Sequence, residues 1–273
     1  MLHKMKIQVI ISFKLLQFLK KLFYLLIRIH IMLKILFSPA EGKSSGGNEE
    51  KKELLGSNDA RLNILNEYNN IVKNGNEEDI KNLFGFKKFS DCVPYISNIF
   101  SSELMCAIQR YQGVAYEYLD FESLNKDEQK YLKNNTIIFS NLYGPILGGD
   151  PIANYKVKQG NNIGTIVPDK FYKDRFSYQL DLYLGSDEIL DLRAGYYDKF
   201  YKTTSSFTTL KFLKDGKTVS HWAKAYRGIV LRELAKNKIS SLEQFKSLDI
   251  PKLSIHEIKV IKNKTEIVYN IIN

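Results

Sequence analysis

Polar and ionisable residues follow the strand-like segments of the sequence, at the points where loops leave buried strands. Lys43 comes after the apolar run 33–37, and Tyr143 and Asp150 come after the run 136–140. Loops at strand ends commonly carry the binding and catalytic groups of α/β proteins. Asp150 or a tyrosine could act there as a general acid or base, while lysines hold a phosphate. We therefore take Lys43, Tyr143 and Asp150 as candidates for catalysis.

Motifs for a metal or a nucleotide cofactor do not accompany these residues. The sequence contains neither a P-loop nor the G-x-G-x-x-G pattern. His221 and His256 stand alone, and Cys92 and Cys106 form no C-x-x-C pair or metal-type cluster. We expect no bound metal and no cofactor, with both thiols free in a reducing compartment.

A group of cations lies on one face of a predicted helix, 223–236. Lys224, Arg227, Gly228 and Leu231 recur at positions i, i+3, i+4 and i+7 of this helix. Two cations beside a glycine would let a phosphate backbone approach closely. The same spacing also fits a solvated helix face with a glycine where two helices cross. The spacing leaves both interpretations open.

Residues 58–88 have the outline of a helix-hairpin-helix. A predicted helix is followed by a turn with Gly75, a second helix and then Lys87 and Lys88. Such hairpins hold DNA through backbone N–H groups and nearby lysines, without reading bases. The glycine pattern usual for this motif is incomplete here.

Strand-like and helical segments interleave over residues 32–273, which predicts one mixed α/β (α+β) domain. Predicted strands cover 33–37, 136–140, 155–159 and 188–194, and predicted hairpins cover 207–222 and 254–272. Predicted helices cover 58–73, 77–84, 102–111, 126–132, 176–184 and 223–236.

The net charge of +10 is concentrated near the N-terminus. Residues 1–31 hold six of the 40 basic residues and none of the 30 acidic ones, so residues 32–273 carry only +4. A nucleic-acid interaction of the predicted domain must therefore depend on local clusters of lysine and arginine, not on bulk charge.

Residues 1–31 are both apolar and basic, which limits what they can be. A transmembrane helix needs about 20 mostly apolar residues, but the longest uncharged run, 7–13, has seven. Lysines also interrupt any secretory signal region, and no small-residue cleavage site follows. Two interpretations stay open: a misassigned start, with Met32 as the true initiator, or an amphipathic helix on a membrane surface. We expect no stable membrane partner unless these residues are translated.

Five collinear segments of the predicted domain resemble the YaaA family of peroxide stress proteins. Further residues match the family after two of these segments. Arg232 follows segment 219–228, and segment 139–144 is followed by Asp150, Tyr155, Lys156 and Gly160. Three positions depart from the family pattern: Glu41 stands where the signature lysine is expected, with Lys43 two residues later, Gln112 replaces a lysine, and Gly195 replaces an acidic residue. The segments are LFSPAEGK (36–43), YQGVAY (111–116), FSNLYG (139–144), LDLRAGYYDKF (190–200) and VSHWAKAYRG (219–228).

The resemblance implies a cytoplasmic protein with a mixed α/β fold peculiar to the family. It also implies protection against hydrogen peroxide by limiting free iron and the DNA damage that iron causes. DNA would bind in a positive cleft that includes a helix-hairpin-helix, without sequence specificity. Residues expected to line the cleft are Lys156, Lys199, Lys224, Arg227 and Arg232, with Lys87 and Lys88 on the hairpin and Tyr116 and Tyr143 available for stacking on bases.

Two functions from different classes therefore compete. A DNA-binding stress protein predicts a long open basic groove and an affinity that falls steeply with salt. An enzyme acting on a nucleotide or nucleic acid predicts that Lys43, Tyr143, Asp150 and Lys199 converge in a closed pocket. A third possibility, membrane-surface association, depends wholly on residues 1–31.

Overall fold

The centre of the fold is strand β1 (Leu33–Phe37), which lies between two parallel neighbours. The computed structural model describes residues 31–272, so the predictions for residues 1–30 lie outside it. Strand β5 (Thr136–Ser140) flanks β1 on one side and β8 (Glu188–Asp191) on the other. Every residue of β1 and β5 is buried, as parallel strands covered on both faces require. The strands predicted over 33–37 and 136–140 are confirmed.

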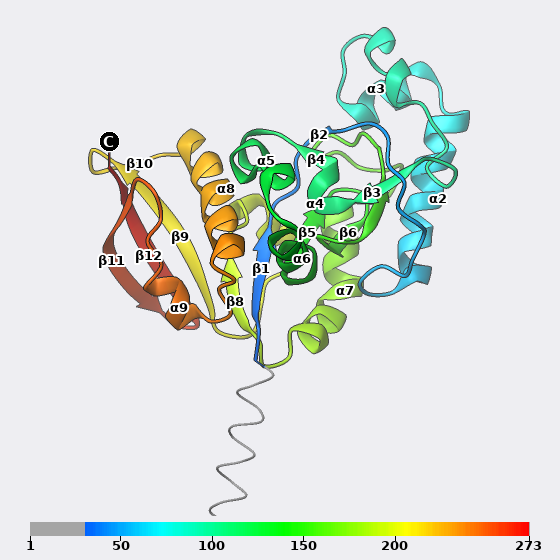
Figure 1. The fold of residues 1–273 in the computed structure, drawn as a ribbon. Helices are drawn as coiled ribbons and strands as arrows, with labels where there is room; N and C mark the ends of the chain where they lie inside the picture. The colour runs from blue at the N-terminus through cyan, green and yellow to red at the C-terminus, as the bar shows by residue number, and fades with distance from the viewer. Residues whose placement is uncertain (1–30, 273) are drawn as a thin grey trace, which may run out of the picture. The chain divides into compact units, whose positions relative to one another are not determined.

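These three strands belong to an eight-stranded mixed sheet (Figure 1). Beyond β5 the sheet ends with β6 (Gly144–Leu147), which forms an antiparallel hairpin with β5. Beyond β8 it continues through β9 (Phe207–Lys214) and β12 (Lys264–Ile271), both parallel to β8, to the antiparallel edge strand β11 (Leu253–Ile261). A short strand, β10 (Lys217–Thr218), pairs with β9. Both predicted hairpins are therefore present.

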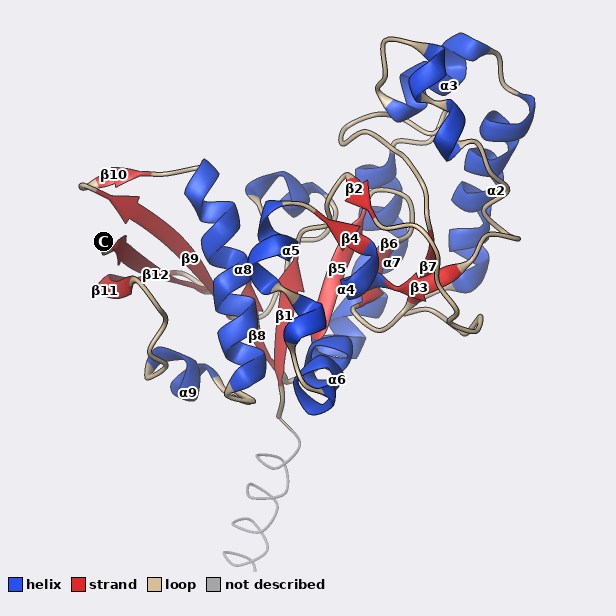
Figure 2. Cartoon of the chain, turned by 45° about the horizontal axis from the view of Figure 1, so that its top comes forward, coloured by secondary structure: helices blue, strands red, loops and turns tan. Residues whose placement is uncertain are grey.

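Helices cover both faces of the sheet (Figures 1 and 2). On one face lie α5 (Val114–Leu119), α6 (Lys126–Asn135) and α8 (His221–Lys236), and on the other lies α7 (Pro168–Leu184). A short helix, α9 (Leu242–Lys246), precedes the last hairpin. The mixed α/β class predicted from the sequence is confirmed.

Helices α2 (Asn58–Asn74) and α3 (Glu77–Phe84) lie where two helices were predicted. Ser57 caps α2 through the N–H of Ala60, and Asn76 begins α3 with a capping box. Gly75 between them has φ −69° and ψ 156°, a conformation that any residue adopts. The pair is a helix–turn–helix unit, and its action as a DNA-binding hairpin stays a prediction. Two 3-10 turns follow at Phe89–Asp91 and Val93–Tyr95.

Two predicted elements are wrong, and tertiary contacts explain both. Instead of one helix over 102–111 the chain forms β3 (Leu104–Cys106), α4 (Ala107–Arg110) and β4 (Tyr111–Gln112), because β3 pairs with β7 (Pro151–Ala153) and β4 with β2 (Gly42–Lys43). Segment 155–159 is not a strand, since its N–H groups bond to the Tyr68 hydroxyl and the Leu83 carbonyl. Helix α7 also begins eight residues before the predicted start, at Pro168, a favoured first helical residue. Single 3-10 turns complete the chain at Phe121–Ser123 and Gly195–Lys199.

Candidate functional site

The carboxyl ends of β1, β5 and β8 meet at one edge of the sheet, where the chain order reverses around β1. In open α/β sheets such a switch point is the usual place for a ligand. Ser38, the first residue after β1, joins the neighbouring loops: its hydroxyl accepts from the N–H of Ala194 (2.8 Å), and its carbonyl accepts from the Tyr116 hydroxyl (2.9 Å). These hydrogen bonds of Ser38 hold together the loops that follow β1 and β8 and helix α5 at the carboxyl ends of the strands.

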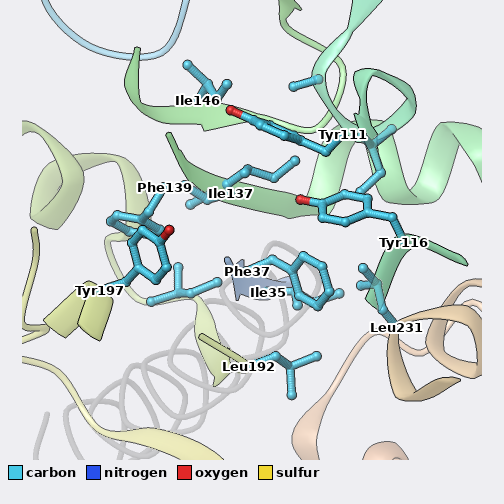
Figure 3. Packing of buried hydrophobic residues seen from close by; sticks show 14 of the residues in the cluster. Ile35, Phe37, Tyr111, Tyr116, Ile137, Phe139, Ile146, Leu192, Tyr197 and Leu231 are labelled. Carbon is cyan, nitrogen blue, oxygen red and sulfur yellow. The ribbon is translucent and has the colours of Figure 1, made fainter. Parts of the chain in front are cut away.

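A chain of buried hydroxyl groups lies beside Ser38. The Ser140 hydroxyl accepts from two backbone N–H groups, of Leu142 (3.2 Å) and Tyr143 (2.9 Å), and lies 2.7 Å from the Tyr155 hydroxyl. The Tyr155 hydroxyl in turn lies 2.9 Å from that of Tyr111. Burial raises the pKa of both tyrosines. Each hydroxyl therefore keeps its proton at neutral pH and can donate one hydrogen bond while it accepts another. Figure 3 shows Tyr111 and Tyr116 with the core residues beneath them.

Lys43 lies over this chain of hydroxyls. Its Nζ is 3.9 Å from the centre of the Tyr155 ring and 5.2 Å from that of Tyr111, and it makes long hydrogen bonds to the carbonyls of Ala40 (3.4 Å) and Glu41 (3.3 Å). Burial, followed by repulsion from Lys156, lowers the pKa of Lys43 to about 7, while Glu41 acts in the opposite direction. Lys43 therefore releases its proton much closer to neutral pH than an ordinary lysine does. The neutral amine can accept a proton or act as a nucleophile.

Glu41 forms an ion pair with Lys156. The Glu41 carboxylate is 3.2 Å from the Lys156 Nζ and also accepts from the N–H of Gln159 (3.4 Å). The Lys156 side chain is only 11% exposed and lies over the Phe86 ring, 5.2 Å from its centre. Glu41 thus ties the loop after β1 to segment 156–160.

Lysines from three neighbouring segments form what we call the basic strip. The end of α3 contacts segment 156–160, because the N–H of Lys158 donates to the Leu83 carbonyl and the Lys158 side chain faces Gly85. On its other side, Gly160 faces the hydroxyl of Tyr196, whose ring lies beneath the Nζ of Lys199 at 5.1 Å. The strip comprises Lys87, Lys88, Lys156, Lys158 and Lys199, and all but Lys156 are exposed.

Asp150 lies away from Lys43, which corrects the expectation that the catalytic candidates converge. Strand β6 runs antiparallel to β5 and brings Leu147 beside Ile137, so the turn that holds Asp150 lies at the amino end of β5. The buried Asp150 carboxylate accepts from the N–H groups of Leu147 (2.9 Å) and Leu55 (3.2 Å). Burial raises the pKa of Asp150. The carboxylate holds two loops together in this position.

Tyr143 and Tyr116 are also engaged inside the protein. The Tyr143 hydroxyl accepts from the N–H of Ala153 (3.2 Å), and its ring meets that of Tyr155 edge-on. Tyr116 is 7% exposed and packs on Phe37 and Tyr111. Neither ring presents a free face for base stacking in this structure.

The structure of α8 distinguishes in part between a phosphate-binding face and a solvated face with a glycine at a helix crossing. Gly228 packs against α5, since a Cβ there would lie 2.0 Å from the Ala115 carbonyl oxygen, so the glycine serves a helix crossing and no phosphate can reach it. Arg232 donates to the carbonyls of Leu119 (2.8 Å) and Asp120 (2.9 Å) at the end of α5. Lys224 is exposed, and Arg227 is half-buried within the electrostatic reach of Asp191 at the carboxyl end of β8.

Sequence reasoning missed two buried arginines that support this edge. Arg61 donates to the carbonyls of Tyr143 (2.8 Å) and Pro145 (3.1 Å) and to that of Leu55. Arg110 donates to the carbonyls of Ser44, Glu103 and Ile152. The sequence does not distinguish a buried arginine from an exposed one by residue type. The signal that could have found Arg61 is its helical spacing from the apolar residues Leu65 and Tyr68, which places it on the buried face of α2.

Residues 42–46, GKSSG, fit the spacing of a G-x-S-x-G nucleophile motif that the sequence reasoning also missed. The motif requires a sharp strand-to-helix turn with an exposed serine, but Ser44 follows β2 in an open loop. Its hydroxyl lies near the carbonyls of Gln109 (3.4 Å) and Arg110 (3.2 Å). The serine therefore fastens this loop to α4.

Three further findings concern the described part of the chain. Cys92 and Cys106 are free and fully buried, and burial raises the pKa of both thiols. Within residues 31–272 no group of three or more His, Cys, Asp or Glu side chains is placed to hold a metal ion. No helix within these residues has the length and apolar character needed to cross a membrane.

Comparisons with known proteins give consistent matches over most of the chain. The family model described as peroxide stress protein YaaA matches residues 33–259. An uncharacterized protein of Campylobacter jejuni is 41% identical over 249 residues, which cover 88% of this chain and 100% of that protein. UPF0246 proteins of Fusobacterium nucleatum and Finegoldia magna are each 27% identical, over 82% and 88% of this chain and 94% and 100% of their own lengths.

Proposed function

Because the chain belongs to the YaaA family of peroxide stress proteins, which supports a role in oxidative stress, we propose that it protects DNA by binding its sugar–phosphate backbone along the basic strip. The proposal includes a cytoplasmic location and binding without sequence specificity. It also includes a reduction of iron-dependent damage to the bound DNA.

The observation that carries this proposal is the arrangement of the strip. Segment 156–160 contacts the end of α3 and also Tyr196, so the segments that carry these lysines are neighbours although they are distant in sequence. Exposed ammonium groups in a row neutralise successive phosphates and release counterions, which gives affinity without base readout. Arg227, which feels the charge of Asp191 at the carboxyl end of β8, and Lys224, exposed one turn earlier on α8, would extend the contact.

Partly exposed aromatic rings support the same surface. Phe86 and Tyr196 are half-buried and lie under Lys156 and Lys199. If each lysine turns from its ring to a phosphate, the uncovered ring face can stack on an unpaired base. We assign them the stacking role expected of Tyr116 and Tyr143, whose rings are covered.

Gel-shift titration of single- and double-stranded DNA at several salt concentrations tests the proposal. Replacing Lys87 and Lys88 by alanine should weaken binding of every sequence alike and reduce the slope of log affinity against log salt by up to about 2. The matched control replaces Lys236 and Lys238, an exposed pair at the carboxyl end of α8, about three turns from Lys224. This variant should bind DNA like the unmodified protein. Equal affinity for all three proteins, or affinity independent of salt, would contradict the proposal.

Iron-dependent damage is tested separately. Plasmid DNA treated with ferrous iron and peroxide should be nicked less when the protein is present, and the Lys87/Lys88 variant should lose this protection in proportion to its lost affinity. Protection that persists without DNA binding would assign it to another mechanism.

A second function is favoured by Lys43 alone. A near-neutral amine over a chain of tyrosine hydroxyls, at the switch point of the sheet, suits proton transfer in an enzyme acting on a nucleotide or nucleic acid. Mass spectrometry of nucleotides and oligonucleotides incubated with the protein tests it. Product formed by the unmodified protein and lost in Lys43→Arg would establish this function, and unchanged substrates would exclude it for the compounds tried.

A further inference from the structure

Strand β11 is a long edge strand whose outer side faces no other strand among the described residues. It runs for nine residues from Leu253 to Ile261 and pairs only with β12 (Figure 1). Large apolar side chains along it are exposed: Ile255 by 42%, Ile258 by 45% and Val260 by 75%. Natural sheets usually protect such an edge, because its unpaired N–H and C=O groups invite another strand.

The hairpin geometry shows which backbone groups of β11 are free. Ile261 and Lys264 flank a two-residue turn and therefore form a hydrogen-bonded pair, so Lys259 and Ile261 bond to β12. The backbone groups of Ile258 and Val260 consequently point away from the sheet. A bulge between Ile255 and Glu257 interrupts the ladder, which leaves 257–261 as the regular part of the edge.

The side chains on this regular part select one register for a symmetric partner. In an antiparallel pair of two identical strands centred on Ile258, Glu257 lies opposite Lys259 of the second copy, and Lys259 lies opposite Glu257. Centring on Glu257 or on Lys259 would place like charges opposite each other, which is destabilising. Only the register centred on Ile258 pairs opposite charges twice and joins the outward-pointing backbone groups.

We propose that two copies of this chain associate through antiparallel pairing of their β11 strands, centred on Ile258. The two sheets become one continuous sheet, and Glu257 and Lys259, now 2.6 Å apart within one chain, also bridge to the second copy. The ladder is short and the exposed apolar area is small, so the dimer dissociates readily on dilution. This proposal does not depend on DNA binding.

Charge reversal tests the register, with sedimentation velocity of the full chain over a range of concentrations as the measurement. Glu257→Lys and Lys259→Glu each place like charges opposite each other twice, and each should weaken self-association by about tenfold or more. An equimolar mixture of the two variants restores both opposite-charge pairs and should form a heterodimer as tight as the unmodified dimer. The double variant with the charges exchanged should also recover.

Backbone pairing is tested independently of charge. Proline at 258 removes an N–H that points to solvent, which an edge strand tolerates, so Ile258→Pro should keep the fold by circular dichroism and abolish the dimer. Charge reversal of exposed Glu243 on α9 is the matched control and should leave the dimer unchanged. A monomeric unmodified chain at all concentrations, or dimers unaffected by these variants, would overturn the proposal, as would single variants that fail to recover on mixing.

Discussion

The two halves of the large sheet differ in where their charged side chains direct their hydrogen bonds. Around β1, β5 and β6, charged groups such as Arg61, Arg110 and Asp150 are buried and bond to the backbone of distant segments. Along β11, charged groups such as Glu257 and Lys259 bond to each other in solvent. The buried charged groups of the first half cross-link its segments around an apolar core, whereas the charged groups along β11 lie outside the core. A charged residue therefore has to be placed in three dimensions before it is read as functional.

Arg61 provides the strongest test of this difference. Arg61→Met leaves three carbonyls, those of Leu55, Tyr143 and Pro145, without their donor in a buried place. We expect the free energy of unfolding to fall by about 3–5 kcal/mol, measured by urea denaturation. Arg175→Met on the exposed side of α7 is the control and should change it little. A loss below about 1 kcal/mol would show that polar bonds do not hold this half together.

Gly228 tests the packing between α8 and α5. Gly228→Ala forces a methyl group against the Ala115 carbonyl, and we expect a loss of about 1–3 kcal/mol in the free energy of unfolding. Gly195→Ala is the matched control, because nothing lies within 4 Å of its added Cβ. The melting temperature of Gly228→Ala should lie clearly below that of Gly195→Ala. Equal melting temperatures would contradict the close packing of Gly228 on α5.

Lys43 makes the stability of the first half depend on pH. Folding lowers the pKa of Lys43 from its ordinary value of 10.5 to about 7, so between these values the unfolded chain binds more protons than the folded chain. The free energy of unfolding should therefore rise with pH, and Lys43→Met should reduce this slope by up to about 1 kcal/mol per pH unit between about pH 7 and 9. Lys88→Met controls for the loss of one charge. Equal slopes in the variant and the unmodified protein would contradict the burial of a neutral amine.

Val260 gives the smallest effect, in the second half. Its side chain is 75% exposed, so Val260→Lys should change the free energy of unfolding by less than about 0.5 kcal/mol. Val268→Lys, at a position 1% exposed in the neighbouring strand, should be severely destabilising by the same chemical denaturation. Similar losses for both variants would mean that the Val260 side chain is packed against other residues of the same chain.

Much of the fold could be predicted because it depends on local sequence. The apolar runs 33–37 and 136–140 and the turn before Lys264 each define an element by nearby residues, and α2 begins within two residues of the predicted cap at Asn58 or Asp59. Segments 102–111 and 155–159 could not be predicted, because their partners are far away in the sequence. Of the residues around the chain of hydroxyls, Lys43 is predicted as a residue after a strand, whereas Tyr155 is predicted inside a strand that does not form.

Asp150 shows why the candidate site could not be completed from the sequence. Its distance from Lys43 follows from the reversal of the chain after β5, which Gly144 permits with φ +69° while its missing side chain makes room for the Tyr172 ring. A predicted strand followed by a polar loop does not reveal this reversal, so Asp150 was assigned to the wrong end of the sheet.

The burial of Cys92 and Cys106 has a consequence for a protein of a peroxide stress family. Peroxide oxidises the thiolate, and burial both excludes the oxidant and keeps each sulfur protonated. These are the two cysteines of the whole sequence, so the folded chain carries no sulfhydryl that could report oxidant levels through its own oxidation. Oxidation of either thiol would require local opening of the fold first.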